Sequence, residues 1–147
     1  MVNKEEKNLA FLTHLSGFGS VFFPFGGIII PLIIWQSKKD KSDFIDRNGK
    51  EAINFNISYL LYTVLLGICS VPFFVGSFFN NLRNQMVDFD DFHFRFDFSS
   101  NHFFGIFSIA SLISVLAIAK VVLIIMAAIN AQKGEDTKYP LTIKFIK

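Results

Sequence analysis

Several polar side chains lie inside long apolar stretches of this 147-residue chain, and their types could support chemistry. The strongest candidates are His14, Asn54, Ser58, Tyr62 and Lys120. A histidine can titrate near neutral pH. A histidine between apolar helices is more often a hydrogen-bonded packing residue, and we favour that interpretation for His14. What these residues can do depends on the segments that position them.

The sequence offers no catalytic constellation around these residues. The histidines at 14, 93 and 102 do not have metal-binding spacing, and the chain contains neither a nucleophile elbow nor a phosphate-binding glycine loop. A single cysteine, Cys69, allows no internal disulfide. The formal net charge is only +2, and no basic patch alternates with stacking aromatic residues. The sequence therefore predicts no enzyme, no cofactor, no metal site and no nucleic-acid partner.

Composition and segment length predict a membrane protein. Hydrophobic residues make up 52% of the chain and charged residues 18%. Three apolar segments, 9–35, 52–79 and 103–131, each exceed the roughly 20 residues that a helix needs to cross a bilayer. Runs of this length would leave a soluble helix without a polar face. We therefore expect an all-α integral membrane helical bundle that forms a single membrane domain over 1–147, with the lipid bilayer as its first partner.

The first apolar segment allows two interpretations. It is broken by glycines and prolines, namely Gly17, Gly19, Pro24, Gly26, Gly27 and Pro31. These residues interrupt helices. The segment is therefore either one kinked span or a broken helical hairpin over 8–38 that turns through 23–27. The hairpin interpretation gives a short N-terminal helical hairpin followed by two long transmembrane helices.

The distribution of basic residues favours the hairpin and gives a topology. The segments 36–51 and 132–147 are rich in lysine and arginine, whereas the loop 80–102 has two arginines and four aspartates. Basic loops stay in the cytoplasm. We expect a multi-pass protein of the cell inner membrane with both termini and the tail 132–147 in the cytoplasm. The Phe/Asp loop 80–102 would then be extracytoplasmic.

The loop 80–102 contains an alternating run, FHFRFDF at 92–98. Strict alternation is typical of a strand with one aromatic face. Such a ribbon could bind a ligand or partner. We favour the simpler interpretation that the phenylalanines rest on the bilayer interface.

The stretch 43–55, DFIDRNGKEAINF, is highly charged and precedes the second apolar segment. Ser42 or Asp43 could cap a helix at the membrane surface. We expect Gly49 to permit a close turn there and Lys50 to face lipid head groups. The stretch would act as a clasp on the membrane surface.

A polar stripe follows this stretch along the second apolar segment. Glu51, Asn54, Ser58 and Tyr62 follow one another at spacings of three, four and four, which places them on one helical face. We expect that face to be a packing seam. Asn54 would bond the backbone at 26–31 or Asn130, and Asn56 would point elsewhere and matter less.

Lys120 lies within the third apolar segment, about 16 Å from its cytoplasmic end at 1.5 Å per residue. An ionisable residue at that depth is a functional candidate. The alternative is a snorkelling lysine that pairs with Ser58 or Tyr62. The sequence leaves both interpretations open.

Several motifs together resemble a known family. They are PLIIW at 31–35, GKEA at 49–52, the pair Asn54 and Phe55, and YPLT at 139–142. This combination resembles the Tic-twenty-like family of small bacterial membrane proteins, which is related to a component of the chloroplast inner-envelope protein-import complex. The resemblance implies a four-helix membrane fold and a role related to protein translocation, but no reaction.

These observations predict a non-enzymatic structural or interaction subunit of a membrane complex. Its partners would be other membrane proteins or further copies of the chain. The alternative function is a small transporter or channel in which His14, Asn54, Tyr62 and Lys120 line a polar path.

Overall fold

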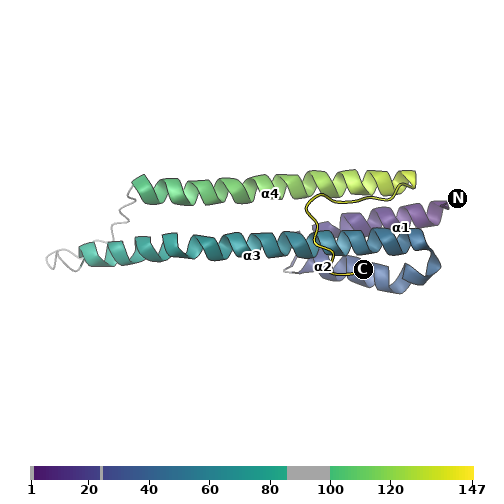
Figure 1. Ribbon diagram of the computed structural model, residues 1–147, viewed down its shortest axis with the longest axis horizontal. Coiled ribbons are helices and arrows are strands. Elements are labelled where there is room, and N and C mark those ends of the chain that lie inside the picture. Colours follow the sequence, from purple (N-terminus) through teal and green to yellow (C-terminus); the bar gives the residue numbers. More distant parts are fainter. Residues whose placement is uncertain (1, 24, 86–99) are drawn as a thin grey trace. The chain divides into compact units, whose positions relative to one another are not determined.

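The computed structural model describes residues 2–23, 25–85 and 100–147, and these residues form helices, short 3₁₀ turns and an extended C-terminal tail (Figure 1). The elements in chain order are α1 (Lys4–Leu15), η1 (Ser16–Val21), α2 (Gly26–Lys38), η2 (Lys39–Lys41), α3 (Asp43–Gln85) and α4 (Ser100–Lys133). The described part of the chain contains no strand. The prediction of an all-α protein with four helices is confirmed. The alternating run 92–98 lies outside the described residues.

The first apolar segment contains two helices, as the hairpin interpretation requires. Asn3 and Glu6 form a capping box at the start of α1. The chain then tightens into η1, and α2 begins after Phe25, whose φ of 66° is left-handed. Gly19 and Gly26 bring η1 and α2 into backbone contact, since a Cβ on Gly26 would lie 2.2 Å from the Gly19 carbonyl oxygen.

The third helix begins earlier than its apolar segment suggests. It starts at Asp43, where the Ile45 N–H donates to the Ser42 hydroxyl at 3.3 Å. Acidic residues in the first turn, Asp43 and Asp46, favour this start because they complement the helix dipole. The stretch 43–55 is therefore helical, and the predicted turn at Gly49 is wrong. Within the described residues, α3 reaches Gln85 and α4 covers Ser100–Lys133, so both helices extend beyond the apolar segments 52–79 and 103–131.

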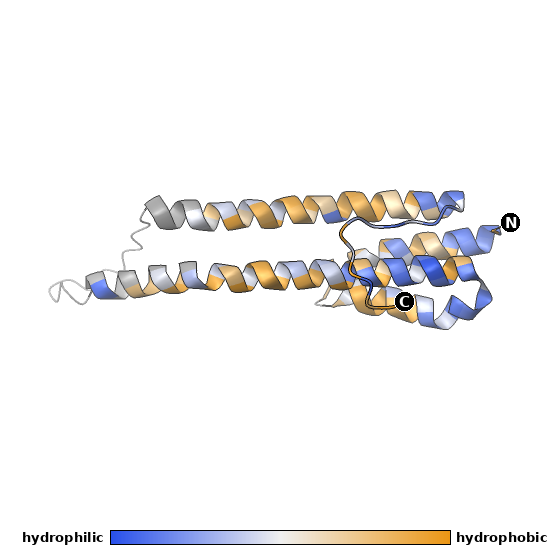
Figure 2. Cartoon of the chain, viewed as in Figure 1, coloured by the Kyte–Doolittle hydropathy of each residue, from blue (hydrophilic) through white to orange (hydrophobic). Residues whose placement is uncertain are grey.

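Two helical stretches, Asp43–Gly76 and Phe107–Lys133, are long and apolar enough to cross a membrane. Figure 2 shows the apolar residues along α3 and α4. Their large side chains are mostly exposed, including Leu61, Leu65, Ile68 and Phe74 on α3 and Val115, Ile118, Val122 and Ile125 on α4. A core helix of a soluble protein would bury such side chains.

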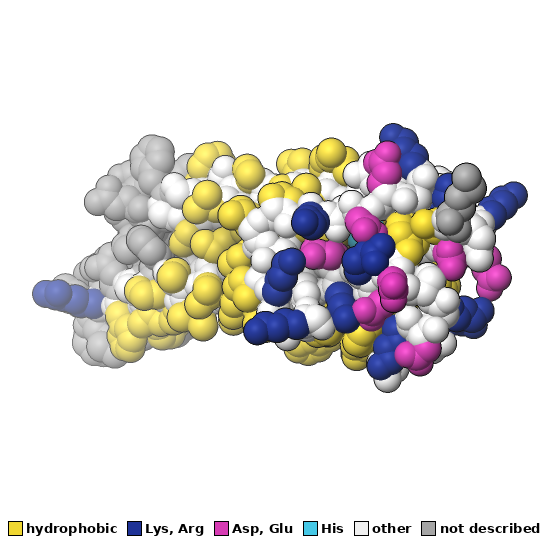
Figure 3. Space-filling model, turned by 45° about the vertical axis from the view of Figure 1, so that its right-hand side comes forward, with side chains coloured by type: hydrophobic (Ala, Val, Ile, Leu, Met, Phe, Trp, Pro, Cys, Tyr) yellow, Lys and Arg dark blue, Asp and Glu magenta, His cyan; other side chains and the backbone are white. Residues whose placement is uncertain are grey.

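The chain divides into two compact units. One contains residues 1–61 and 117–147, and we call it the hairpin unit. The other contains residues 62–116. The core of the hairpin unit has two buried clusters: Phe55, Ile124, Ala127 and Tyr139 form the first, and Ala10, Phe44 and Ala131 form the second. Acidic and basic side chains gather on the surface over this unit, next to apolar ones (Figure 3). All contacts described below lie within the hairpin unit.

Candidate functional site

The C-terminal tail, residues 134–147, lies along α3 and is held there by Asn54. The Asn54 carboxamide oxygen accepts hydrogen bonds from the backbone N–H groups of Phe145 at 3.1 Å and Ile146 at 2.9 Å. Its Nδ2 donates to the Ile146 carbonyl at 2.9 Å. The Asn54 side chain is buried. One side chain of α3 thus bonds three backbone groups of a tail that contains no helix or strand.

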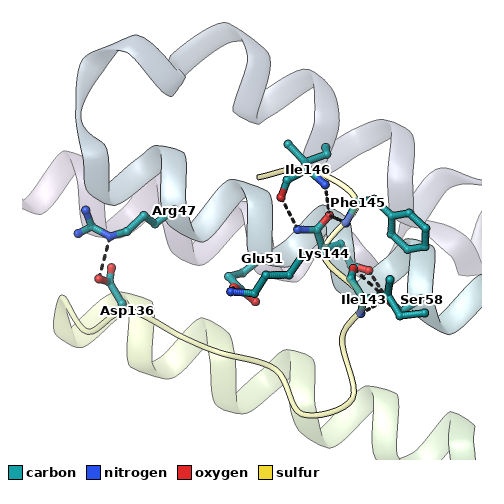
Figure 4. Close-up of polar contacts among 9 residues, drawn as sticks. Arg47, Glu51, Ser58, Asp136, Ile143, Lys144, Phe145 and Ile146 are labelled. Carbon is teal, nitrogen blue, oxygen red and sulfur yellow. Dashed lines mark hydrogen bonds and ion pairs between the residues drawn. The ribbon is translucent and has the colours of Figure 1, made fainter.

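Further side chains of α3 extend this attachment (Figure 4). The Ser58 hydroxyl accepts from the Ile143 N–H at 2.9 Å and donates to the Asn54 carbonyl at 2.8 Å. Glu51 pairs with Lys144 at 3.6 Å. The face that the spacing of polar residues predicted is therefore a packing seam at Glu51, Asn54 and Ser58. The tail occupies it, so the partners predicted for Asn54 at 26–31 and at Asn130 are wrong.

The start of the tail is held by a second, separate group around His14. This histidine is fully buried, with Nδ1 at 2.9 Å from the Tyr139 hydroxyl and Nε2 at 3.0 Å from Asn48 Oδ1. Asn48 Nδ2 donates to the Phe44 carbonyl, so its oxygen faces His14 as an acceptor. We infer that Nε2 carries the proton and that Nδ1 accepts from Tyr139. The Tyr139 ring also stacks on Phe55, with centroids 4.0 Å apart.

This arrangement stabilises a neutral His14. Burial lowers the pKa of His14, and the hydrogen bond to Asn48 only partly opposes that effect. Burial and the Glu51 carboxylate raise the pKa of the Tyr139 hydroxyl, so it remains a donor. In this structure His14 is a hydrogen-bonded packing residue that joins α1, α3 and the tail.

The neutral state of His14 predicts an acid-sensitive fold. An exposed histidine has a pKa of about 6.5. The folded pKa is lower, so the contribution of neutral His14 is complete above about 6.5 and is lost as pH falls from there towards the folded pKa. We expect the unfolding temperature in detergent to fall between about pH 7.5 and 5.5. His14→Gln cannot titrate and should show a smaller fall. Equal falls in both proteins would contradict this role of His14.

Lys120 contacts the hairpin rather than the tail. Its ammonium donates to the Ser20 hydroxyl at 3.0 Å and lies over the Tyr59 ring, 4.4 Å from the centroid. The Lys120 side chain is buried. The predicted pairing with Ser58 is wrong, because that hydroxyl bonds the tail. Tyr62 lies in the other compact unit and is half-buried.

The charged start of α3 packs closely on α2. A Cβ on Gly49 would lie 2.2 Å from Trp35 Cδ1, so the glycine permits the indole to approach the helix. The Trp35 indole N–H donates to Asp46 at 2.9 Å, and Lys50 pairs with the same carboxylate at 2.6 Å. Gly49 is thus a point of close contact between helices. Lys50, predicted to face head groups, bonds a neighbouring carboxylate.

Asn56 is the buried residue that the sequence reasoning undervalued. It is 3% exposed, and its amide fits against two glycines of the hairpin. A Cβ on Gly17 would lie 2.9 Å from Asn56 Nδ2, and one on Gly27 would lie 3.1 Å from Oδ1. Asn56 therefore packs against the hairpin, although its Nδ2 donates to the Ala52 carbonyl of α3 and it forms no hydrogen bond like the one predicted for Asn54. The sequence signal for this contact was the group of glycines in the first apolar segment, because glycines leave room for a side chain of a neighbouring helix.

The structure therefore distributes the predicted polar residues among separate groups. Glu51, Asn54 and Ser58 bind the tail, His14 binds Tyr139 and Asn48, and Lys120 binds Ser20. Within the described ranges, no group of three His, Cys, Asp or Glu residues could hold a metal ion. The chemistry of these groups is hydrogen bonding that fixes the tail and the hairpin on α3.

Comparison with known proteins gives the family. The model of the magnetosome magnetite crystal formation protein family, MamF/MmsF, matches residues 5–146. No curated protein and no solved structure matches the chain. The resemblance to the Tic-twenty-like family is thereby corrected, because its motifs all lie inside the matched range and the match is to a different family. The expectation of a role in protein translocation is withdrawn with it. The helices, the tail and every group described above lie within a chain that belongs to the magnetosome magnetite crystal formation protein family.

Proposed function

We propose that this chain is a non-enzymatic integral membrane protein of the magnetosome membrane and a structural or interaction subunit in magnetite crystal formation. The observation that carries the proposal is the family match over residues 5–146. The two long apolar helices support it, because a membrane family needs spans of this length. In this proposal one membrane domain, residues 1–147, has α3 and α4 as its spans.

The exposed apolar side chains of the two spans support embedding in lipid. Val115, Ile118 and Val122 on α4 are 60%, 65% and 48% exposed. Burial of apolar surface is worth about 25 cal/mol per Å², so lipid around these side chains would stabilise the protein substantially. Lipid contact explains why α3 and α4 carry so much uncovered apolar surface. The topology follows the basic residues, with both termini and the segment 36–51 on the cytoplasmic side.

The polar groups of the hairpin unit support a structural role. A transport path would need polar side chains that can release their partners to a passing solute. Here Asn54 holds the tail backbone through three hydrogen bonds, and His14 is held on both ring nitrogens. Lys120 is held by Ser20. Partners of this kind fix one conformation, which suits a scaffold that presents its surface to other membrane proteins or to further copies of itself.

The proposal is tested by removing the chain from a magnetite-forming bacterium and restoring it. The expected result is altered size or shape of the magnetite crystals, seen by electron microscopy, with recovery when the wild-type chain is supplied. The restored protein should stay in the membrane fraction after alkaline carbonate extraction. Unchanged crystals in the deleted strain would overturn the role in crystal formation. Release of the protein by carbonate would overturn the integral membrane assignment.

A further inference from the structure

The C-terminal tail presents an apolar strip on its outer side. Leu141, Ile143 and Phe145 are 85%, 41% and 49% exposed. They stand at positions 141, 143 and 145, and all three side chains are exposed although the neighbouring backbone is bonded to α3. The tail therefore combines backbone bonds to α3 with three large apolar side chains that the protein leaves uncovered.

Several backbone groups of this strip are bonded by side chains of α3. Asn54 and Ser58, both buried, bond the N–H groups of Ile143, Phe145 and Ile146 and one carbonyl. In water a tail of this length could bond solvent instead. In lipid a non-helical segment is tolerated only where its polar groups find protein partners. The two side chains supply such partners for the backbone groups that they bond, and both belong to the candidate span Asp43–Gly76.

The conformation of Leu141 is a second, independent observation. Its φ is 58°, in the left-handed region. A non-glycine residue there costs about 1 kcal/mol or more, and strained residues that persist often have functional reasons. Leu141 follows Pro140 directly and is the most exposed side chain of the strip. The strained turn thus keeps the Leu141 side chain exposed, whereas a leucine in a folded protein is usually buried.

The charges of the tail complete the pattern. Residues 137–147 contain Lys138, Lys144 and Lys147 and no acidic residue. The Lys144 side chain is 63% exposed although it pairs with Glu51. Apolar side chains next to lysines are typical of segments that lie at a membrane interface, where the bases attract anionic lipids.

We propose that the docked tail is a lipid-binding element, in which Leu141, Ile143 and Phe145 enter the acyl region and the lysines contact anionic head groups. This inference rests on the proposed membrane embedding of α3 and α4. It differs from a plain cytoplasmic tail, which was the expectation from the basic residues alone. The partner is the bilayer that surrounds the adjacent span, since the strip is attached to that span through Asn54 and Ser58.

The test uses the full chain with Cys69→Ser and one new cysteine that carries a polarity-sensitive fluorophore. The protein is placed in phosphatidylcholine vesicles with or without phosphatidylglycerol. Leu141→Cys is the test position, Val122→Cys on α4 reports the proposed span, and Glu135→Cys is the aqueous control. Each label is quenched with brominated lipid and with iodide in water. We expect the label at 141 to be quenched several-fold more by brominated lipid than by iodide, and the label at 135 to show the reverse.

The outcomes separate the strip from the proposed function. If the label at 122 is not quenched by brominated lipid, the membrane embedding itself fails. If 122 responds to lipid but 141 responds to iodide alone, the strip is overturned. If 141 responds to neither quencher, protein covers the strip, and that also overturns the proposal. Replacing the three lysines by glutamine should reduce lipid quenching at 141 mainly in vesicles with phosphatidylglycerol, and an unchanged response would overturn the anionic-lipid contact.

Discussion

Replacing Gly26 with alanine should destabilise the protein by about 3 kcal/mol or prevent the hairpin from packing. A Cβ at this position would lie 2.2 Å from the carbonyl oxygen of Gly19 and 2.7 Å from its carbonyl carbon. Both are backbone atoms, which cannot rotate away as the end of a side chain can. The two segments must therefore separate, and the contacts of η1 on α2 are lost with them. The measurement is the unfolding temperature of the purified protein in detergent.

Gly67→Ala is the matched control for this substitution. Gly67 also lies in a helix, α3, but a Cβ there would meet no atom within 4 Å. Alanine is a better helix former than glycine by about 1 kcal/mol, so Gly67→Ala should leave the unfolding temperature unchanged or raise it. If Gly26→Ala unfolds at the wild-type temperature, the backbone contact between Gly19 and Gly26 is not needed for the fold.

The break in the first segment could be predicted from the sequence because glycine and proline act locally. Six of them within 17–31 interrupt a helix whatever surrounds it. The long apolar helices could also be predicted, since the length and composition of a segment indicate whether it can span a membrane. The cap at Ser42 or Asp43 was predicted, but a close turn was expected at Gly49 because the charged stretch 43–51 resembles a surface segment. Trp35 packing on Gly49 and a serine cap make that stretch helical instead.

The position of the tail could not be predicted, because it depends on contacts between residues about 90 positions apart. Asn54 was identified as a buried amide, but many backbone groups could satisfy it. The choice of Phe145 and Ile146 follows from tertiary packing alone. Similarly, the family resemblance rested on four short motifs, at 31–35, 49–52, 54–55 and 139–142, and the match over residues 5–146 is to a different family. Such motifs indicate a hairpin of helices better than they identify a family.

Replacing Asn54 with leucine should release the end of the tail from α3. Three hydrogen bonds to the backbone of Phe145 and Ile146 are lost at once. Each is worth about 0.5–1.5 kcal/mol, but water can solvate the released groups, so we expect a net loss of about 2 kcal/mol. Tyr139 should stay in place, because His14 and Phe55 hold it independently.

Limited trypsin digestion in detergent can separate these two parts of the tail. Cleavage after Lys144 requires release of the segment that Asn54 holds, whereas cleavage after Lys138 requires release of Tyr139. If the tail opens and closes faster than trypsin cuts, the cleavage rate is proportional to the fraction of molecules with the tail released. Destabilising the bound tail by about 2 kcal/mol should then speed cleavage after Lys144 by about 30-fold. Cleavage after Lys138 should change much less.

Asn56→Leu is the control with the same chemical change two residues along α3. Asn56 faces Gly17 and Gly27 of the hairpin, so its replacement should leave cleavage after Lys144 near the wild-type rate. It should instead lower the unfolding temperature, because leucine must fit against glycine backbones where a planar amide fits now. If cleavage after Lys144 becomes equally faster in both variants, release of the tail depends on the stability of the whole hairpin unit rather than on the bonds to Asn54. Opposite selectivity, with faster release in Asn56→Leu, would show that Asn54 does not hold the tail.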